Sequence, residues 1–287
     1  MARAPKKTTG TAVANWQSEM AKSAAKAAEM EKSTSGGRFF SMKAGQLKFD
    51  DVAMPGNMMA CVILHGVYEN VYYAGKYDPD NKAPPACFAF WHPDDEEEMQ
   101  PHPDVDTEDC FTRQSDACEG CPQNEWGSAE VGKGKACSNR RRLALIPAGI
   151  YKSLGKNKGF DLEMFNAEED FKKSDLAFMK LPVMSVKGYS AFTREVTEQL
   201  GKPLWAVYTN ISVEADERSQ FRVNFELIDE IPDDLMGIIF KRHTAAKDET
   251  AFPYRPPSDD EDAAPVKNTA AKKLAGKTPA KRSRVKK

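Results

Sequence analysis

The chain has 287 residues, which is enough for one large domain or two small ones with flexible ends. Its formal net charge is only −2, so total charge says little about its partners. No run of roughly eighteen apolar residues is present to cross a membrane, and no apolar stretch follows the first residues as in a secretory signal. We therefore expect a cytoplasmic protein without membrane partners, whose cysteines are reduced or metal-bound.

Charges of opposite sign are separated along the chain. Eleven acidic residues and one basic residue lie between Asp94 and Glu119, whereas eight Lys/Arg and no acid lie between Gly132 and Gly159. Nine further Lys/Arg and no acid lie between Val266 and Lys287. Blocks of one sign attract a polyanion such as nucleic acid even where the total charge is near zero.

Both ends of the chain have a composition that cannot form a packed core. Residues 1–35 are rich in Ala, Lys, Ser and Thr, and residues 247–287 are Pro-rich, then acidic, then basic. Such segments bury too little apolar surface to offset the entropy of ordering them. The sequence therefore predicts a flexible N-terminal arm, a core over residues 36–246 and a disordered C-terminal tail.

The first half of the core is predicted to be β-rich. A strand or hairpin is expected over Phe39–Phe49, and a long strand over Met58–Tyr73. Strict alternation assigns the apolar residues of that long strand to two faces: Val62, Leu64, Tyr68 and Tyr72 on one, and Cys61, Ile63, Val67 and Val71 on the other. Short strands are expected over Cys87–Trp91 and from Arg141 to Pro147.

The second half contains a helix and two more strands. Val186, Tyr189, Phe192 and Val196 follow a helical period over Ser185–Leu200, with Ser185 as the expected N-cap. Strands are expected over Leu204–Val213 and Phe221–Leu227, followed by a short helix from Pro232 toward His243. The fold class expected is mainly β with some α: an OB-like Greek-key barrel with a zinc-ribbon-like insertion at about residues 87–140.

The cysteines of this insertion predict a metal site. Cys118 and Cys121 form a CxxC pair that can place both sulfurs on one ion, and Cys137 follows at a distance typical of a second pair. Spacing leaves the fourth ligand open among Cys87, Cys110, His92 and His102. Cys61 lies in an apolar run and is expected in the core. A structural Zn²⁺ would also order a long polar insertion that lacks periodicity of its own.

A basic and aromatic set surrounds these cysteines. The candidate DNA-binding residues are Lys133, Lys135, Arg140, Arg141, Arg142 and Lys152, with the aromatic residues Tyr73, Tyr77, Trp126 and Tyr151. Cations along a groove and aromatic faces for stacking are what sequence-tolerant binding of single-stranded nucleic acid requires.

Catalytic motifs are weak. Gly127–Gly134 is close to a phosphate-binding loop, but Gly134 replaces the Ser/Thr that would bind Mg²⁺, and neither a strand before it nor a helix after it is predicted. The four histidines are scattered, and the carboxylates occur as runs typical of a solvated face. We expect no enzymatic activity and no small-molecule substrate.

Four segments resemble a family of bacteriophage and prophage proteins associated with single-stranded DNA binding in replication or recombination. They begin at Tyr73 (YAGKYDPD), Pro84 (PPACFA), Cys118 (CEGCPQNEWGS) and Gly134 (GKACSNRRRLA), and the resemblance covers about residues 38–230. It implies Cys87, Cys118, Cys121 and Cys137 as the zinc ligands and the host cytoplasm as the location. One departure is the basic C-terminal end, where an acidic tail that recruits partners is typical.

The function expected is therefore sequence-independent binding of single-stranded DNA in replication, recombination or repair, with replication or recombination proteins as further partners. An alternative is a zinc-ribbon adaptor that binds duplex DNA or protein. A third interpretation is a nucleotide-dependent enzyme that uses the incomplete phosphate-binding loop. Relative affinity for oligo-dT, duplex DNA and ATP separates the three.

Overall fold

The computed structural model describes residues 20, 39–42, 45–49, 52–75, 83–155, 159–216 and 220–254. Apart from Met20, the arm expected over residues 1–35 lies outside these residues. So does the tail beyond residue 254. Within the described residues, no helix combines the length and apolar character needed to cross a membrane.

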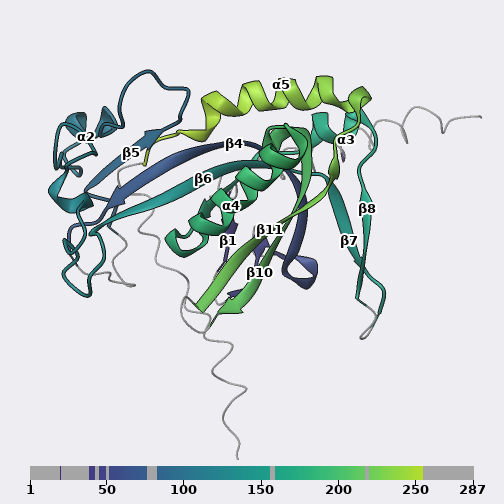
Figure 1. Ribbon diagram of the computed structural model, residues 1–287, viewed down its shortest axis with the longest axis horizontal. Helices are drawn as coiled ribbons and strands as arrows, with labels where there is room; N and C mark the ends of the chain where they lie inside the picture. The colour runs from purple at the N-terminus through teal and green to yellow at the C-terminus, as the bar shows by residue number, and fades with distance from the viewer. Residues whose placement is uncertain are drawn as a thin grey trace, which may run out of the picture.

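One long strand, β4 (Met58–Tyr72), is the centre of the main sheet. The antiparallel order is β11-β10-β4-β6-β9, and β5 also pairs with β4 (Figure 1). The partners are β5 (Cys87–Trp91), β6 (Cys137–Pro147), β9 (Ala177–Leu181), β10 (Val207–Asp216) and β11 (Gln220–Glu230). β10 joins the first residues of β4 and β5 joins the last, while β6 follows β4 along its length. The prediction of a mainly β protein with some α structure is confirmed.

Smaller elements surround this sheet. β1 (Phe40–Ser41), β2 (Lys48–Phe49) and β3 (Val52–Ala53) form a three-stranded sheet, and β7 (Gly149–Ser153) and β8 (Phe160–Met164) form a hairpin. Short helical turns are η2 (Pro55–Asn57), α2 (Asp104–Thr107), η3 (Pro122–Asn124), α3 (Glu168–Lys173) and η4 (Leu204–Ala206). Between β5 and β6 the described residues form only α2 and η3, so a zinc-ribbon hairpin is not supported.

A bulge in β4 exchanges the faces of the strand. The register against β6 shifts between Ile63 and His65, so Ile63 pairs with Leu145 whereas Gly66 pairs with Leu143. One extra residue in a strand reverses the side-chain alternation beyond it. Cys61 and Ile63 therefore share a face with Tyr68 and Tyr72, and the assignment from strict alternation was wrong. We call this the inner face and the opposite one the outer face.

Two long helices cover these two faces. α4 (Val183–Leu200) lies on the inner face, and α5 (Asp233–Thr250) lies on the outer face (Figure 1). Phe192 and Val196 of α4 pack in the core that contains Cys61 and Ile63. Leu235 and Ile239 of α5 pack in a second core with Val62 and Leu64. α5 continues to Thr250, so the first residues of the expected tail are part of the folded body.

The sheet does not close into a barrel in the described part of the chain. β9 and β11 are the two end strands of this order and run in the same direction. A barrel would close if these two strands paired. α4 packs beside β11 instead, and the backbone N–H of Val223 donates to Oγ of Ser185 over 3.1 Å. Ser185 was expected to be the N-cap of α4, but the helix begins at Val183 with Pro182 as its N-cap. The hydroxyl of Ser185 caps the edge strand instead.

Ser185→Ala is therefore expected to lower the free energy of unfolding by about 1–3 kcal/mol, because the buried N–H of Val223 loses its acceptor. Ser190→Ala is the matched control, since Ser190 is exposed on the same helix and reports only the helix propensity of alanine. Urea denaturation of both variants measures the difference. Equal stability of the two variants would contradict the role given to Ser185.

Candidate functional site

Strand pairing brings two distant cysteines together. Tyr72 of β4 pairs with Cys87 of β5 on one side and with Cys137 of β6 on the other. Residues opposite one another in neighbouring strands project to the same face of a sheet. Cys87 and Cys137 are therefore both on the inner face, although 49 residues separate them in the sequence.

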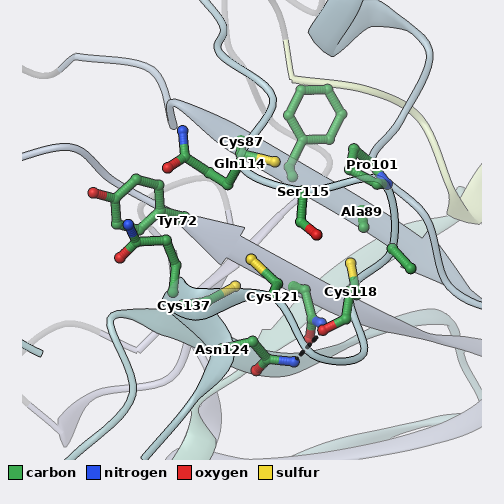
Figure 2. Close-up of a pocket in the computed structure, with 14 residues that line it drawn as sticks. Tyr72, Cys87, Ala89, Pro101, Gln114, Ser115, Cys118, Cys121, Asn124 and Cys137 are labelled. Atoms are coloured by element: carbon green, nitrogen blue, oxygen red, sulfur yellow. Dashed lines mark hydrogen bonds between the residues drawn. The ribbon is translucent and has the colours of Figure 1, made fainter. Parts of the chain in front are cut away.

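A loop brings the CxxC pair to the same place. Gly120 between the two cysteines has φ of 70°, a left-handed conformation that favours glycine. The side-chain amide of Asn124 in η3 donates to the carbonyl of Cys118 over 2.8 Å, and its backbone N–H donates to the carbonyl of Cys121. The four sulfur-bearing side chains line a single pocket (Figure 2). We call it the thiol pocket.

Burial sets the protonation of these thiols. Burial, together with the neighbouring cysteines, raises the pKa of Cys118 to about 11 and that of Cys137 to about 12. Burial also raises the pKa of Cys87. Without a cation the pocket thus favours neutral thiols, whereas a divalent metal would favour thiolates. As the side chains lie, no three or more His, Cys, Asp or Glu in the described ranges are arranged to hold an ion.

The other two cysteines and the two candidate histidines lie elsewhere. Cys110 is exposed, and Cys61 is in the inner core, where burial raises its pKa. The ring of His102 stacks on Phe88 at 5.2 Å, and that of His92 lies against His65 at 4.5 Å. None of the four lines the thiol pocket. Of the alternatives for the fourth ligand, the structure places Cys87 beside the other three.

The three consecutive arginines of β6 have different surroundings. Arg142 is 1% exposed on the outer face, where its Nε donates to Oε1 of Glu69 over 3.1 Å. Its guanidinium lies between the rings of Phe90 and Phe252, at 4.3 and 4.4 Å from their centroids. Arg142 therefore stabilises the fold and is not accessible to DNA, contrary to the expectation from sequence. Arg140 is half-buried on the same face.

Arg141 projects to the inner face because side chains alternate along a strand. Its guanidinium carbon lies 3.3 Å from the centroid of the Tyr68 ring. Tyr68 in turn lies beside Trp91 of β5. The sequence prediction did not select Tyr68 or Trp91 as DNA contacts. Only the pairing of β5, β4 and β6 brings them next to Arg141.

The other predicted contacts fall into two groups. Lys133, Lys135, Tyr73 and Trp126 are on or beside the loop that forms the thiol pocket, and Trp126 is 78% exposed. By contrast, Tyr151 and Lys152 are on the β7–β8 hairpin, at the opposite end of the molecule from β5 (Figure 1). There, the hydroxyl of Tyr151 donates to Asn210, and Lys152 pairs with Glu163. Tyr77 lies outside the described residues.

The segment that is close to a phosphate-binding loop has none of the required context. It follows η3 and precedes β6, so no strand enters it and no helix leaves it. The backbone N–H groups of Gly127 and Ala129 both donate to the carbonyl of Gly134. The loop thus closes on itself beside the thiol pocket, and its N–H groups do not form a phosphate cradle.

The buried position of Arg142 predicts a large effect on stability. Arg142→Ala should lower the free energy of unfolding by about 3–5 kcal/mol, because it leaves the carboxylate of Glu69 buried without its partner. Arg140→Ala, at the half-buried neighbour, should cost about 1 kcal/mol or less. Urea denaturation compares the two. If both variants unfold at the same urea concentration, the Arg142–Glu69 pair does not have the importance assigned to it.

Comparison with known proteins identified no relative. No family model matches the chain, and neither the curated proteins nor the solved structures contain a match. The function must therefore be argued from the site itself.

Proposed function

We propose that this protein binds single-stranded DNA without sequence preference, using a zinc-stabilised loop on an OB-like core. The observation that carries the proposal is the position of the thiol pocket. The antiparallel order contains five strands, which are β4, β6, β9, β10 and β11 in chain order. The pocket lies in the connection between the first two, β4 and β6. In OB folds this connection is one of the loops that bind oligonucleotides.

The strand order supports the OB-like assignment. β4, β6 and β9 form a three-stranded meander, α4 follows, and the β10–β11 hairpin then returns to the far side of β4. A meander, a helix and a crossing hairpin are the order of elements in an OB fold, which is a partly open Greek-key barrel. The present sheet differs because β9 and β11 are its two ends: among the described residues, α4 packs beside β11, and Phe39 forms a bridge to β9.

The donor set of the thiol pocket fits zinc. Four thiols and no carboxylate are gathered there, and sulfur ligands favour Zn²⁺ over Mg²⁺ or Ca²⁺. Cys87, Cys118, Cys121 and Cys137 would hold the ion. It would act structurally, joining the ends of β5 and β6 to the long irregular connection between them.

Cations near this pocket support binding of a polyanion. Lys133 is exposed, Lys135 is half-buried 5.9 Å from the ring centroid of Trp126, and Arg140 follows on β6. Together with Tyr73, which is 42% exposed, they combine positive charge with accessible aromatic rings. On this basis the resemblance to phage single-stranded DNA-binding proteins is also retained as a proposal, with a role in replication or recombination.

The metal proposal predicts about one zinc per chain in freshly purified, reduced protein. Cys121→Ser should lose the zinc and expose residues 92–136 to proteolysis, because the loop then lacks its main source of ordering energy. Cys110→Ser is the matched control and should keep the metal, since Cys110 is exposed outside the pocket. Elemental analysis provides the measurement. Wild-type protein free of metal would exclude a zinc centre.

The DNA proposal predicts that binding depends on salt and prefers single strands. The double substitution Lys133→Ala with Lys135→Ala should weaken binding to all sequences about equally. For each phosphate that the variant no longer neutralises, the log–log salt slope should become shallower by about 0.7. Lys172→Ala with Lys173→Ala on α3 is the control, since these exposed lysines pair with Glu168 and Glu169 away from the site.

Fluorescence anisotropy with labelled oligo-dT and duplex DNA over a salt series measures these effects. A clear preference for duplex DNA would contradict the proposal and favour the adaptor alternative. An equal loss of affinity in the control variant would show that binding depends on the total charge of the protein and not on the lysines of this site.

A further inference from the structure

Three planar side chains lie in one row across three strands of the inner face. Tyr68 of β4 pairs with Trp91 of β5 on one side and with Arg141 of β6 on the other. The guanidinium carbon of Arg141 is 3.3 Å from the centroid of the Tyr68 ring, and the ring of Trp91 meets Tyr68 edge-on at 5.2 Å and 72°. We call these residues the planar row.

The planar row is open although its side chains are large. Tyr68 is 36% exposed, and Trp91 and Arg141 are each partly exposed. α4 covers the inner face at Gly66, where the hydroxyl of Tyr189 would lie 3.2 Å from an added Cβ. Tyr68 and Arg141 are the next inner-face residues along β4 and β6 in the direction of the thiol pocket.

The outer face is closed to a ligand at the same level. Phe252 and Tyr254 follow α5 and pack over Arg142, and the hydroxyl of Tyr254 contacts both Glu69 and Lys180 at 3.0 Å. In OB folds the ligand usually lies on the outer surface of the second and third strands. Here those strands are β6 and β9. Because α5 and residues 252–254 cover the outer face, a ligand would reach the inner face instead.

The charges around the planar row are asymmetric. On one side, the side-chain oxygen of Asn124 accepts hydrogen bonds from both Lys135 and Asn139. Asn139 also donates to Asn70, and these two asparagines form the next row of the inner face. On the other side, the indole N–H of Trp91 donates to the carbonyl of Glu97, in the acidic turn over residues 94–98. A phosphate backbone would therefore run on the lysine side, with its bases directed toward the row.

We propose that the planar row is a stacking site for an unpaired nucleobase. This inference rests on the proposed function and adds the ligand group and the residues that bind it. A base has a π face whatever its identity, so stacking on an aromatic ring or a guanidinium plane tolerates any sequence. Base pairing in a duplex hides these faces, and the site thus selects single strands.

The test compares oligo-dT with an oligomer of equal length that has abasic deoxyribose phosphate in place of every nucleotide. Wild-type protein should bind oligo-dT more tightly, since stacking contributes to affinity only when bases are present. Tyr68→Leu should reduce oligo-dT affinity by about five- to a hundred-fold and leave abasic affinity unchanged. Tyr68→Phe keeps the ring and should bind both oligomers as wild type does.

Arg141→Lys provides a second and independent variant. It keeps the positive charge and loses the planar group, so it should lower oligo-dT affinity while the salt slope stays as in wild type. Thermal unfolding of each variant is measured alongside. If the contact between Tyr68 and Trp91 were purely structural, its loss would lower stability and weaken binding to both oligomers alike.

The possible outcomes separate the two proposals. Equal binding of oligo-dT and the abasic oligomer by wild-type protein would overturn the stacking site and leave DNA binding intact. The same holds if Tyr68→Leu retains the full preference for oligo-dT. Absence of binding to either oligomer would instead overturn the proposed function, and the stacking site with it.

Discussion

The structure depends on the hydrogen bonding of one strand along both of its edges. β4 has 15 residues, and β6 pairs with it from Cys61 to Tyr72. Its other edge is shared, with β10 at the start and β5 at the end. Since β10 belongs to the core and β5 leads into the cysteine-bearing connection, β4 joins two parts of the molecule that would otherwise be separate. The bulge near Ile63 and His65 then determines which side chains of the far half share the inner face.

The two long helices determine which surfaces a ligand can reach. α4 packs beside β11, where the hydroxyl of Ser185 accepts a hydrogen bond from the backbone N–H of Val223. α5 and the residues after it cover the outer face and enclose Arg142 with Glu69. This pair is 1% and 0% exposed, so its desolvation is offset only while both charges and the surrounding rings are in place. In the described part of the chain, Tyr68, Trp91 and Arg141 on the inner face stay partly exposed near the thiol pocket.

The thiol pocket and the planar row are parts of one surface. Cys87, Tyr72 and Cys137 form one row across β5, β4 and β6, and Trp91, Tyr68 and Arg141 form another four residues along the strands. Between them, the side-chain amide of Asn139 donates hydrogen bonds both to Asn70 and to Asn124 of the cysteine loop. An ion that orders the loop would therefore also fix one border of the proposed stacking site, so its loss would weaken the proposed DNA binding without any direct contact between ion and DNA.

Sequence alone determined the features that depend on local spacing and composition. The CxxC pair, the strand Cys87–Trp91, the α4 region and the predominance of β structure follow from short-range patterns, because turns, helical periods and alternation involve only neighbouring residues. The three short strands β7, β8 and β9 were not predicted. Each has only five residues, and of the three only β8 alternates strictly between apolar and polar residues.

Only the tertiary structure decided what depends on pairing between distant segments. A one-residue bulge reversed the faces of β4, the edges of β5 and β6 brought Cys87 beside Cys137, and Arg142 was buried while Arg141 stayed accessible. Three consecutive arginines look alike in a sequence. They differ in the fold because alternate residues of a strand face opposite sides, and because residues more than a hundred positions away, such as Phe252, decide which side is covered.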